Sequence, residues 1–172
     1  MSVRVLIVED ESLIRWSLRQ KFEERGYQVL EAETGQAALD AFEEGLFDLI
    51  MLDYKLPDIT GLDVLHGLRQ IDQDAVVIMM TAYSTIETAV EAIKLGAFNY
   101  IAKPFQMEEL LVTVDKALET TQLRREVREL RRHLREEFGI NAIIGQDASM
   151  LRLFETIKQV ARTGVSTVFL RG

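Results

Sequence analysis

The chain lacks cysteine altogether, so it can form no disulfide, no thiolate metal site and no thiol nucleophile. No apolar run is long enough to span a bilayer, and the N-terminus lacks the pattern of a signal peptide. We therefore expect a cytoplasmic protein without a membrane partner. Only two prolines interrupt the 172 residues, a length that suffices for one well-cored domain and an appendage.

Basic residues are scarce in the first part of the chain. Residues 1–120 carry 10 lysine and arginine residues against 22 acidic ones, whereas residues 121–172 carry 10 against 6. The acidic part is a poor candidate for direct nucleic-acid binding, which requires cations that neutralise phosphates. The Arg-rich second part needs a separate explanation.

Apolar strands alternate with amphipathic helices through residues 1–120. The expected strands cover residues 3–8, 27–30, 49–53, 75–80 and 98–102, and the expected helices cover 12–25, 34–44, 62–71, 84–95 and a last segment from 107. Ser12 and Ser84 are the expected N-caps of the first and fourth helices. The alternation predicts an α/β fold, a doubly wound five-stranded parallel sheet with helices on both faces.

Polar side chains stand at the carboxyl ends of four of these strands. They are Glu9 and Asp10 after the first strand, Asp53 at the end of the third, Thr81 after the fourth and Lys103 after the fifth. The carboxyl ends of parallel strands share one edge of a sheet, where open α/β folds do their chemistry. We therefore expect these side chains to converge. Taken alone, Asp53 fits a turn or helix-capping role equally well.

Three carboxylates at one place repel one another unless a cation lies among them. Hard oxygen ligands with open positions suit Mg²⁺, which takes one or two carboxylates together with a phosphate oxygen. A lysine ammonium and a threonine hydroxyl would complete a cage for a phosphoryl group. Asp53 is then the expected nucleophile, which forms an acyl phosphate. The alternative is an ordinary cluster of polar residues at strand ends.

Residues 1–120 resemble the receiver domains of two-component response regulators, through the segments 8–11, 52–54, 56–58 with Gly61, 80–82 and 103–105. The resemblance implies that Asp53 accepts phosphate from a sensor histidine kinase. It also implies that Thr81 and Lys103 contact the phosphate and that Tyr100 changes rotamer on phosphorylation. For Tyr100, simple packing at the sheet edge is the alternative.

The same resemblance implies a magnesium site made by Glu9, Asp10, Asp53 and the backbone carbonyl of Lys55. Many receivers have aspartate where this chain has Glu9. The longer side chain is expected to reach the metal through a water molecule.

A helical pattern runs from residue 107 to Gly139 without a stop signal, and such a helix would be about 48 Å long at 1.5 Å per residue. Its second part shows the 4-3-4 apolar spacing of a coiled-coil seam, formed by Leu123, Val127, Leu130 and Leu134. Valine at position a with leucine at position d favours a parallel two-stranded coil. We expect residues 107–138 to form a homodimer, and a solvated, Arg-rich linker helix is the alternative.

Residues 139–172 resemble the start of the AAA+ ATPase domain of sigma-54-dependent activators of the nitrogen-regulation type, whose receivers also match residues 81–84, 87–97 and 100–105. The expected organisation is a receiver over 1–120, a linker helix over 107–138 and a truncated fragment of a second α/β domain over 139–172. No GxxxxGK[ST] loop is present, so we expect no ATPase activity. Contact with sigma-54 RNA polymerase and DNA, like ATP binding, would require domains outside this chain.

These observations predict a phospho-accepting receiver that regulates a sigma-54-dependent activator through dimer rearrangement, and not an enzyme beyond transfer of phosphate to itself. A stand-alone phosphorelay receiver without transcriptional output is one alternative. A phosphatase that uses Asp53 as its nucleophile is another. Such hydrolases usually carry an acid two residues later, where this chain has Lys55.

Overall fold

The computed structural model describes residues 2–82 and 86–138, together with residues 152 and 156. The chain divides into two compact units, Met1–Arg125 and Glu126–Gly172. In chain order the elements are β1 (Arg4–Val8), α1 (Ser12–Glu24), β2 (Gln28–Ala32), α2 (Gly35–Glu44), β3 (Leu49–Asp53), α3 (Gly61–Ile71), β4 (Val77–Thr81), α4 (Ile86–Lys94), β5 (Asn99–Ala102) and α5 (Met107–Phe138). The expected fragment of a second α/β domain over 139–172 lies, apart from residues 152 and 156, outside the described residues.

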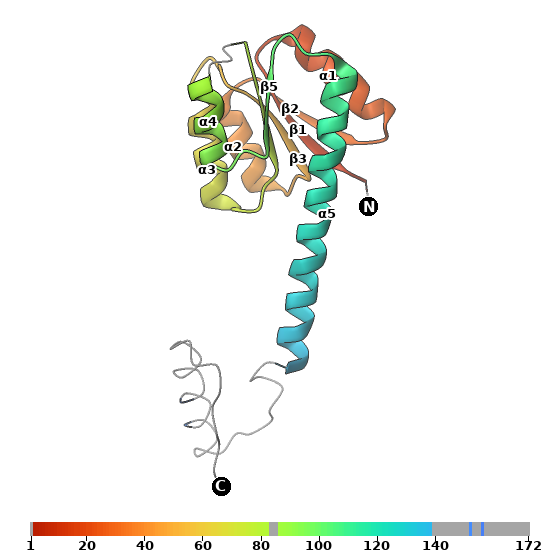
Figure 1. The fold of residues 1–172 in the computed structure, drawn as a ribbon, viewed down its shortest axis with the longest axis vertical. Helices are drawn as coiled ribbons and strands as arrows, with labels where there is room; N and C mark the ends of the chain where they lie inside the picture. Colours follow the sequence, from red (N-terminus) through yellow and green to blue (C-terminus); the bar gives the residue numbers. More distant parts are fainter. Residues whose placement is uncertain (1, 83–85, 139–151, 153–155, 157–172) are drawn as a thin grey trace. The chain divides into compact units, whose positions relative to one another are not determined.

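The five strands form one parallel sheet in the order β2-β1-β3-β4-β5. Every residue of β3 and β4 is buried, because helices cover both faces of the sheet (Figure 1). Burial on both faces explains why these two strands are continuous apolar runs instead of alternating patterns. The predicted doubly wound α/β fold is confirmed.

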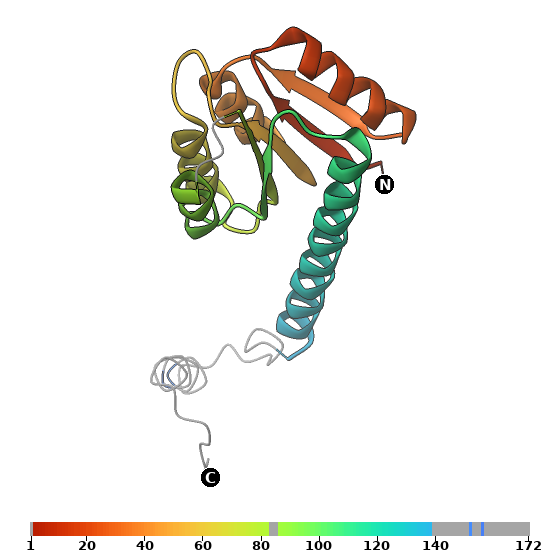
Figure 2. The same cartoon turned by 45° about the horizontal axis from the view of Figure 1, so that its top comes forward.

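Two hydrophobic cores lie on opposite faces of the sheet, and Figure 2 shows from a second direction the helices that cover these faces. Helices α1 and α5 cover one face through Leu18, Phe22, Leu110, Val114 and Ala117. Helices α2, α3 and α4 cover the other through Ala38, Phe42, Val64, Leu65, Leu68 and Ala92. Successive residues of β3 point alternately into the two cores, so that the strand is fixed from both sides.

The start of α1 differs from the prediction in its cap, and α2 and α3 start one residue away from the predicted positions, at Gly35 and Gly61. The N-cap of α1 is Glu11, which forms no side-chain capping bond, and Ser12 is already helical. The predicted Ser12 cap is therefore wrong, because the helix begins one residue too early for that hydroxyl to reach a free backbone N–H. Thr34 and Thr60 cap α2 and α3 through their side chains. The predicted Ser84 cap lies outside the described residues.

Several strand boundaries were misplaced by one or two residues. Strand β2 extends to Ala32, and β4 begins at Val77 and ends at Thr81 instead of covering 75–80. The backbone ladder sets these limits: Ala32 is in register with Val8, and Thr81 with Ala102. Pairing uses backbone groups, so apolar side chains alone did not reveal where it stops.

Helix α5 has the predicted bounds, from Met107 to Phe138. Further along it, Leu123, Val127 and Leu130 are 55%, 47% and 62% exposed, and the side chain of Leu134 lies outside the described residues. The coiled-coil seam stays a prediction. In the part of the chain that the structure describes, neither α5 nor any other helix combines the length and hydropathy needed to cross a membrane.

Candidate functional site

Three strand ends bring Glu9, Asp53 and Lys103 into direct contact. The Lys103 ammonium donates hydrogen bonds to Glu9 Oε2 at 2.6 Å and to Asp53 Oδ2 at 2.9 Å. Strands β1 and β3 are neighbours, whereas β5 lies beyond β4 at the edge of the sheet. The lysine side chain therefore reaches across the end of β4, and the convergence predicted for these residues is observed.

Asp10 completes a group of three acids. Glu9, Asp10 and Asp53 each place a carboxylate oxygen within 4.8 Å of the others. Glu9 and Asp53 are 0% and 5% exposed, whereas Asp10 lies at the surface. Two buried oxygen ligands and one open to solvent fit a hard cation that retains several water molecules. The carboxylates of Glu9, Asp10 and Asp53 thus suit Mg²⁺, the cofactor implied by the resemblance.

Burial and charge shift two of the proton affinities in the site. Burial raises the pKa of Glu9 to about 7, and the hydrogen bond from Lys103 acts in the opposite direction. Burial alone would lower the pKa of Lys103, but its hydrogen bonds to Glu9 and Asp53 raise that pKa above the ordinary value. Lys103 is therefore a permanent cation at neutral pH, next to a carboxyl group close to its titration point.

A pocket of about 230 Å³ opens beside Asp53, lined by Asp10, Glu11, Asp53, Lys55, Ala82 and Lys103. Thr81 is 1% exposed at the end of β4, and its backbone carbonyl accepts a hydrogen bond from the Lys103 N–H at 2.7 Å. Ala82 rather than Thr81 lines the pocket, and its small side chain leaves room beside Asp53. The predicted phosphate contact of the Thr81 hydroxyl stays a prediction.

The loop after β3 is held by backbone interactions. Lys55 forms an isolated antiparallel bridge with Thr60, which fixes the backbone at the predicted carbonyl ligand. Asp58 accepts hydrogen bonds from the backbone N–H groups of Gly35 and Gln36 at 2.8 and 2.9 Å. Both bonds lower the pKa of Asp58, and the bond from Gln36 contributes most to this shift. The Asp58 carboxylate therefore ties this loop to the start of α2.

Gly61 allows α3 to begin directly against the end of β3. A Cβ atom there would lie 2.2 Å from the Asp53 backbone oxygen and 2.8 Å from Tyr54 Cα. Both are backbone atoms of the strand end, so no side-chain rotation would relieve the overlap. Glycine at position 61 is thus required by close packing beside Asp53.

Tyr100 lies in the middle of β5 and is partly buried against the core formed with α2, α3 and α4. Its hydroxyl lies 3.4 Å from Thr88 Oγ1 in α4. The ring therefore connects the edge strand to α4. The observed position agrees with packing at the sheet edge. The rotamer change on phosphorylation stays a prediction.

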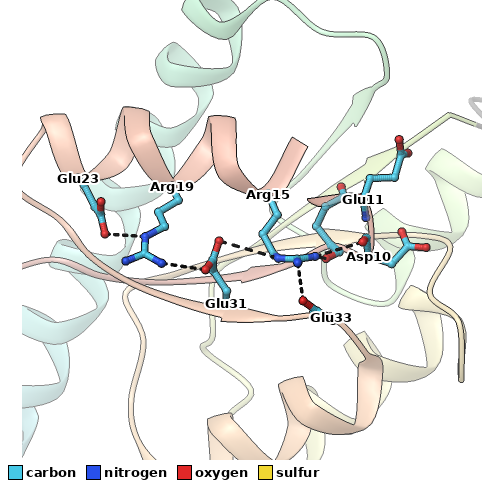
Figure 3. Close-up of polar contacts among 8 residues, drawn as sticks. Asp10, Glu11, Arg15, Arg19, Glu23, Glu31 and Glu33 are labelled. Atoms are coloured by element: carbon cyan, nitrogen blue, oxygen red, sulfur yellow. Dashed lines mark hydrogen bonds and ion pairs between the residues drawn. The ribbon is translucent and has the colours of Figure 1, made fainter. Parts of the chain in front are cut away.

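Arg15 is a residue near the site that the sequence reasoning missed. Its guanidinium contacts the backbone carbonyls of Glu9 and Asp10. Figure 3 shows Arg15 beside Asp10 and Glu33. The available signal was its position in the first turn of the predicted helix, directly after the acidic segment. A single arginine on an amphipathic helix is too common for that position alone to mark it.

Comparison with known proteins identifies the family. The family model described as the response regulator receiver domain matches residues 5–115 of this chain. A CheY-like receiver from Methanospirillum hungatei JF-1 is 32% identical with a TM-score of 0.70, over 72% of this chain and 99% of that one. The beryllofluoride-activated NtrC4 receiver domain dimer is 38% identical with a TM-score of 0.66, over 69% and 98%.

Longer relatives align along almost the whole chain. Regulatory protein AtoC of Escherichia coli is 32% identical over 96% of this chain and 36% of its own length. The alginate biosynthesis transcriptional regulatory protein AlgB of Pseudomonas syringae is 34% identical over 97% and 37%. The chain thus spans about a third of these relatives. Sporulation initiation phosphotransferase F of Bacillus subtilis is 38% identical over 69% of this chain and 95% of its own length. The chain belongs to the response regulator receiver domain family.

Proposed function

We propose that Asp53 accepts a phosphoryl group from a phosphohistidine of a sensor histidine kinase. The observation that carries the proposal is the Lys103 ammonium bonded to both Asp53 and Glu9 at the carboxyl edge of the sheet. A pocket opens beside it, with Asp10 at the rim. A buried carboxylate beside a fixed cation and an open pocket suits nucleophilic attack on a phosphoryl group.

In the transfer, an Asp53 carboxylate oxygen attacks phosphorus while the bond from phosphorus to the histidine nitrogen breaks. Glu9, Asp10, Asp53 and the Lys55 carbonyl would hold Mg²⁺, which neutralises charge on the phosphoryl oxygens when it is bound. Lys103 neutralises a further part of that charge without a proton transfer. Thr81 is proposed to donate its hydroxyl to the phosphate.

The proposed output passes from Thr81 to Tyr100 and α4. Tyr100 approaches Thr88 of α4, so a change at the end of β4 has a direct neighbour through which to act. The proposed response is a shift between two arrangements of this face that changes a homodimer formed by α5, by the receiver face or by both. Exposed Leu123, Val127 and Leu130 support the helical contact.

We infer that the receiver belongs to a sigma-54-dependent transcriptional activator that acts in the cytoplasm. The alignments with AtoC and AlgB cover 96% and 97% of this chain, and so extend beyond the receiver into residues 139–172. That segment carries the resemblance to the start of the AAA+ domain. ATP binding and contacts with sigma-54 RNA polymerase and DNA would belong to domains outside this chain.

A stand-alone phosphorelay receiver is the second candidate. It is favoured by the match to sporulation initiation phosphotransferase F, which is covered over 95% of its own length. That alignment covers only 69% of this chain. The reading frame beyond Gly172 distinguishes the two: a GxxxxGK[ST] loop soon after this position supports the activator.

Intact-mass measurement after incubation with acetyl phosphate and Mg²⁺ tests the acceptor. One added phosphoryl group is expected for the wild type and for Asp40→Asn, which alters an exposed aspartate on α2. Asp53→Asn should remain unlabelled. An unlabelled wild type, or equal labelling of Asp53→Asn, would overturn the assignment. Continuous turnover of phosphate esters would instead favour a phosphatase.

A further inference from the structure

The segment of Glu9, Asp10 and Glu11 joins β1 to α1 and carries two of the three clustered acids. The N-cap residue of the helix that follows, Glu11, makes no side-chain capping bond. Consecutive carboxylates repel one another, and the usual strand-to-helix capping bond is missing. Within the segment, the Glu11 backbone N–H donates to Glu9 Oε1 at 3.2 Å, and contacts from outside the segment add to this bond.

Arg15 supplies such contacts. It lies in the first turn of α1, and its side chain, 11% exposed, turns back over the acidic segment (Figure 3). One nitrogen, Nη1, donates to the Glu9 carbonyl at 2.6 Å and to the Asp10 carbonyl at 3.1 Å. A single rigid guanidinium thus fixes two consecutive peptide groups, from which both acidic side chains project.

The opposite side of the guanidinium is held by acids from the edge of the sheet. Arg15 Nη2 lies 2.5 Å from Glu33 Oε1, and Nε lies 3.9 Å from Glu31 Oε1. Glu31 also accepts a hydrogen bond from Arg19, one turn further along α1. These acids fix the plane of the guanidinium and offset its charge, so that Arg15 does not simply repel a cation beside Asp10.

We propose that Arg15 is a positioning residue for metal binding: it holds the backbone of Glu9 and Asp10 so that their carboxylate oxygens stay within 4.8 Å of each other and of Asp53. The inference rests on the proposed Mg²⁺-dependent phospho-acceptor. Arg15 itself donates to the two carbonyls and would not touch the metal. Groups that orient metal ligands typically change metal affinity by roughly 10–100-fold when they are removed.

The charge of Arg15 and its positioning role predict opposite results. Through charge alone, removal of a cation near the acids would tighten Mg²⁺ binding. Through positioning, removal leaves two carbonyls unheld and lets Asp10 move away from Glu9 and Asp53, which Lys103 still joins. The loss of this ligand geometry weakens binding. The sign of the affinity change therefore separates the two effects.

The test is Mg²⁺ titration by calorimetry of the full 172-residue chain and of Arg15→Met, which keeps most of the aliphatic stem. Arg19→Met is the matched control. Like Arg15, Arg19 is a positive charge on α1 that pairs with Glu31, but its hydrogen bonds go to Glu23 and Glu31 and not to the acidic segment. We expect Arg15→Met to weaken Mg²⁺ binding roughly 10–100-fold and Arg19→Met to change it less than about twofold.

A second readout needs no metal. The Glu11 backbone N–H donates to Glu9 Oε1 at 3.2 Å, so its hydrogen exchange reports the order of the segment. In Mg²⁺-free protein this exchange should be faster in Arg15→Met than in the wild type or Arg19→Met. Urea unfolding of all three proteins shows whether a global loss of stability accounts for the difference.

Unchanged or tighter Mg²⁺ binding by folded Arg15→Met would overturn the proposal. If that variant does not fold, Arg15→Lys carries the same prediction with a smaller loss, because it keeps the charge but lacks the planar guanidinium that holds both carbonyls. Wild-type protein that binds no Mg²⁺, or Asp10→Asn that binds it equally well, would overturn the proposed metal site as well. Normal wild-type binding with no effect of Arg15 would remove this inference alone.

Discussion

Glu9 is a buried acid whose proton affinity makes folding depend on pH. Burial raises its pKa from 4.5 to about 7 in the folded chain. A folded-state pKa above the unfolded value means that the folded protein binds more protons between these two pH values. The stability contribution of protonated Glu9 is fully present below pH 4.5 and is lost as pH rises through about 7.

We predict that Glu9→Gln removes this part of the pH dependence, because glutamine stays neutral throughout. In Mg²⁺-free urea titrations, the wild type should lose on the order of 2 kcal/mol relative to the variant between pH 5 and 8. Circular dichroism at several pH values measures the two unfolding free energies. Parallel curves for the two proteins would show that Glu9 does not titrate in this interval.

Residues at strand ends were predictable because the topology forces them together. Asp53 and Lys103 each follow an apolar run, and parallel strands place such positions on one edge. Arg15 was not predictable in this way, since its contacts depend on a side-chain rotamer and on where α1 starts. The sequence identifies the acids of the site but not the group that holds their backbone.

At the scale of elements, the contact between α3 and β3 leaves no space at Gly61. Gly61→Ala should destabilise the protein by roughly 2–4 kcal/mol, because the new methyl group meets backbone instead of mobile side chains. Urea unfolding measures the loss. The matched control is Gly67→Ala in the same helix, where the nearest atom is the flexible end of Leu39 and a change within about 1 kcal/mol is expected. Equal losses would contradict the packing argument.

The start of β3 is joined to α5 through Asp48. This buried carboxylate accepts a hydrogen bond from the Arg4 backbone N–H at 2.8 Å and pairs with Arg125. Thr121 donates to its backbone carbonyl at 2.7 Å. Asp48 therefore contacts both the start of β1, at Arg4, and helix α5, at Thr121 and Arg125.

We predict unequal costs for the two members of the ion pair. Asp48→Ala leaves the Arg4 N–H without its acceptor and should cost roughly 1–3 kcal/mol. Arg125→Ala removes a side chain that is 44% exposed and should cost less than about 1 kcal/mol. Chemical denaturation of both variants checks the order. A greater loss for Arg125→Ala would show that the ion pair, rather than the backbone bond, stabilises this junction.

Element types were easier to predict than element limits. The long apolar runs at β3 and β4 and the uninterrupted pattern of α5 identified these elements. The cap at Ser12 failed because a capping side chain is one of several ways to satisfy a helix start. At the start of α1, Arg15 bonds instead to the backbone carbonyls of Glu9 and Asp10. The hydrophobic pattern of the sequence does not indicate such contacts.

At the scale of the whole molecule, exposed apolar residues on α5 remain to be explained. We predict that the 172-residue chain forms a concentration-dependent dimer, because Leu123, Val127 and Leu130 are largely exposed at coiled-coil spacing. Leu130→Asp should weaken the dimer at least about tenfold, since it places a charge in an apolar seam. Sedimentation velocity over a range of concentrations measures both.

Arg128→Ala is the control for that measurement. It changes the net charge by the same amount as Leu130→Asp but lies outside the predicted seam, so the dimer should persist. A monomer at every concentration would contradict the helical contact. Equal weakening by both variants would point to a general charge effect.

The Lys103 ammonium is one positive charge divided between two acids on different strands. Any anion that enters beside Asp53 competes for that charge, so the bond to Glu9 and the new bond cannot both keep their full strength. Lys103 directly follows β5, the edge strand of the sheet. A change in the hydrogen bonds of its ammonium at Asp53 therefore also affects this edge strand. Amide chemical shifts along β5 should therefore change when a single anion binds beside Asp53, two strands away.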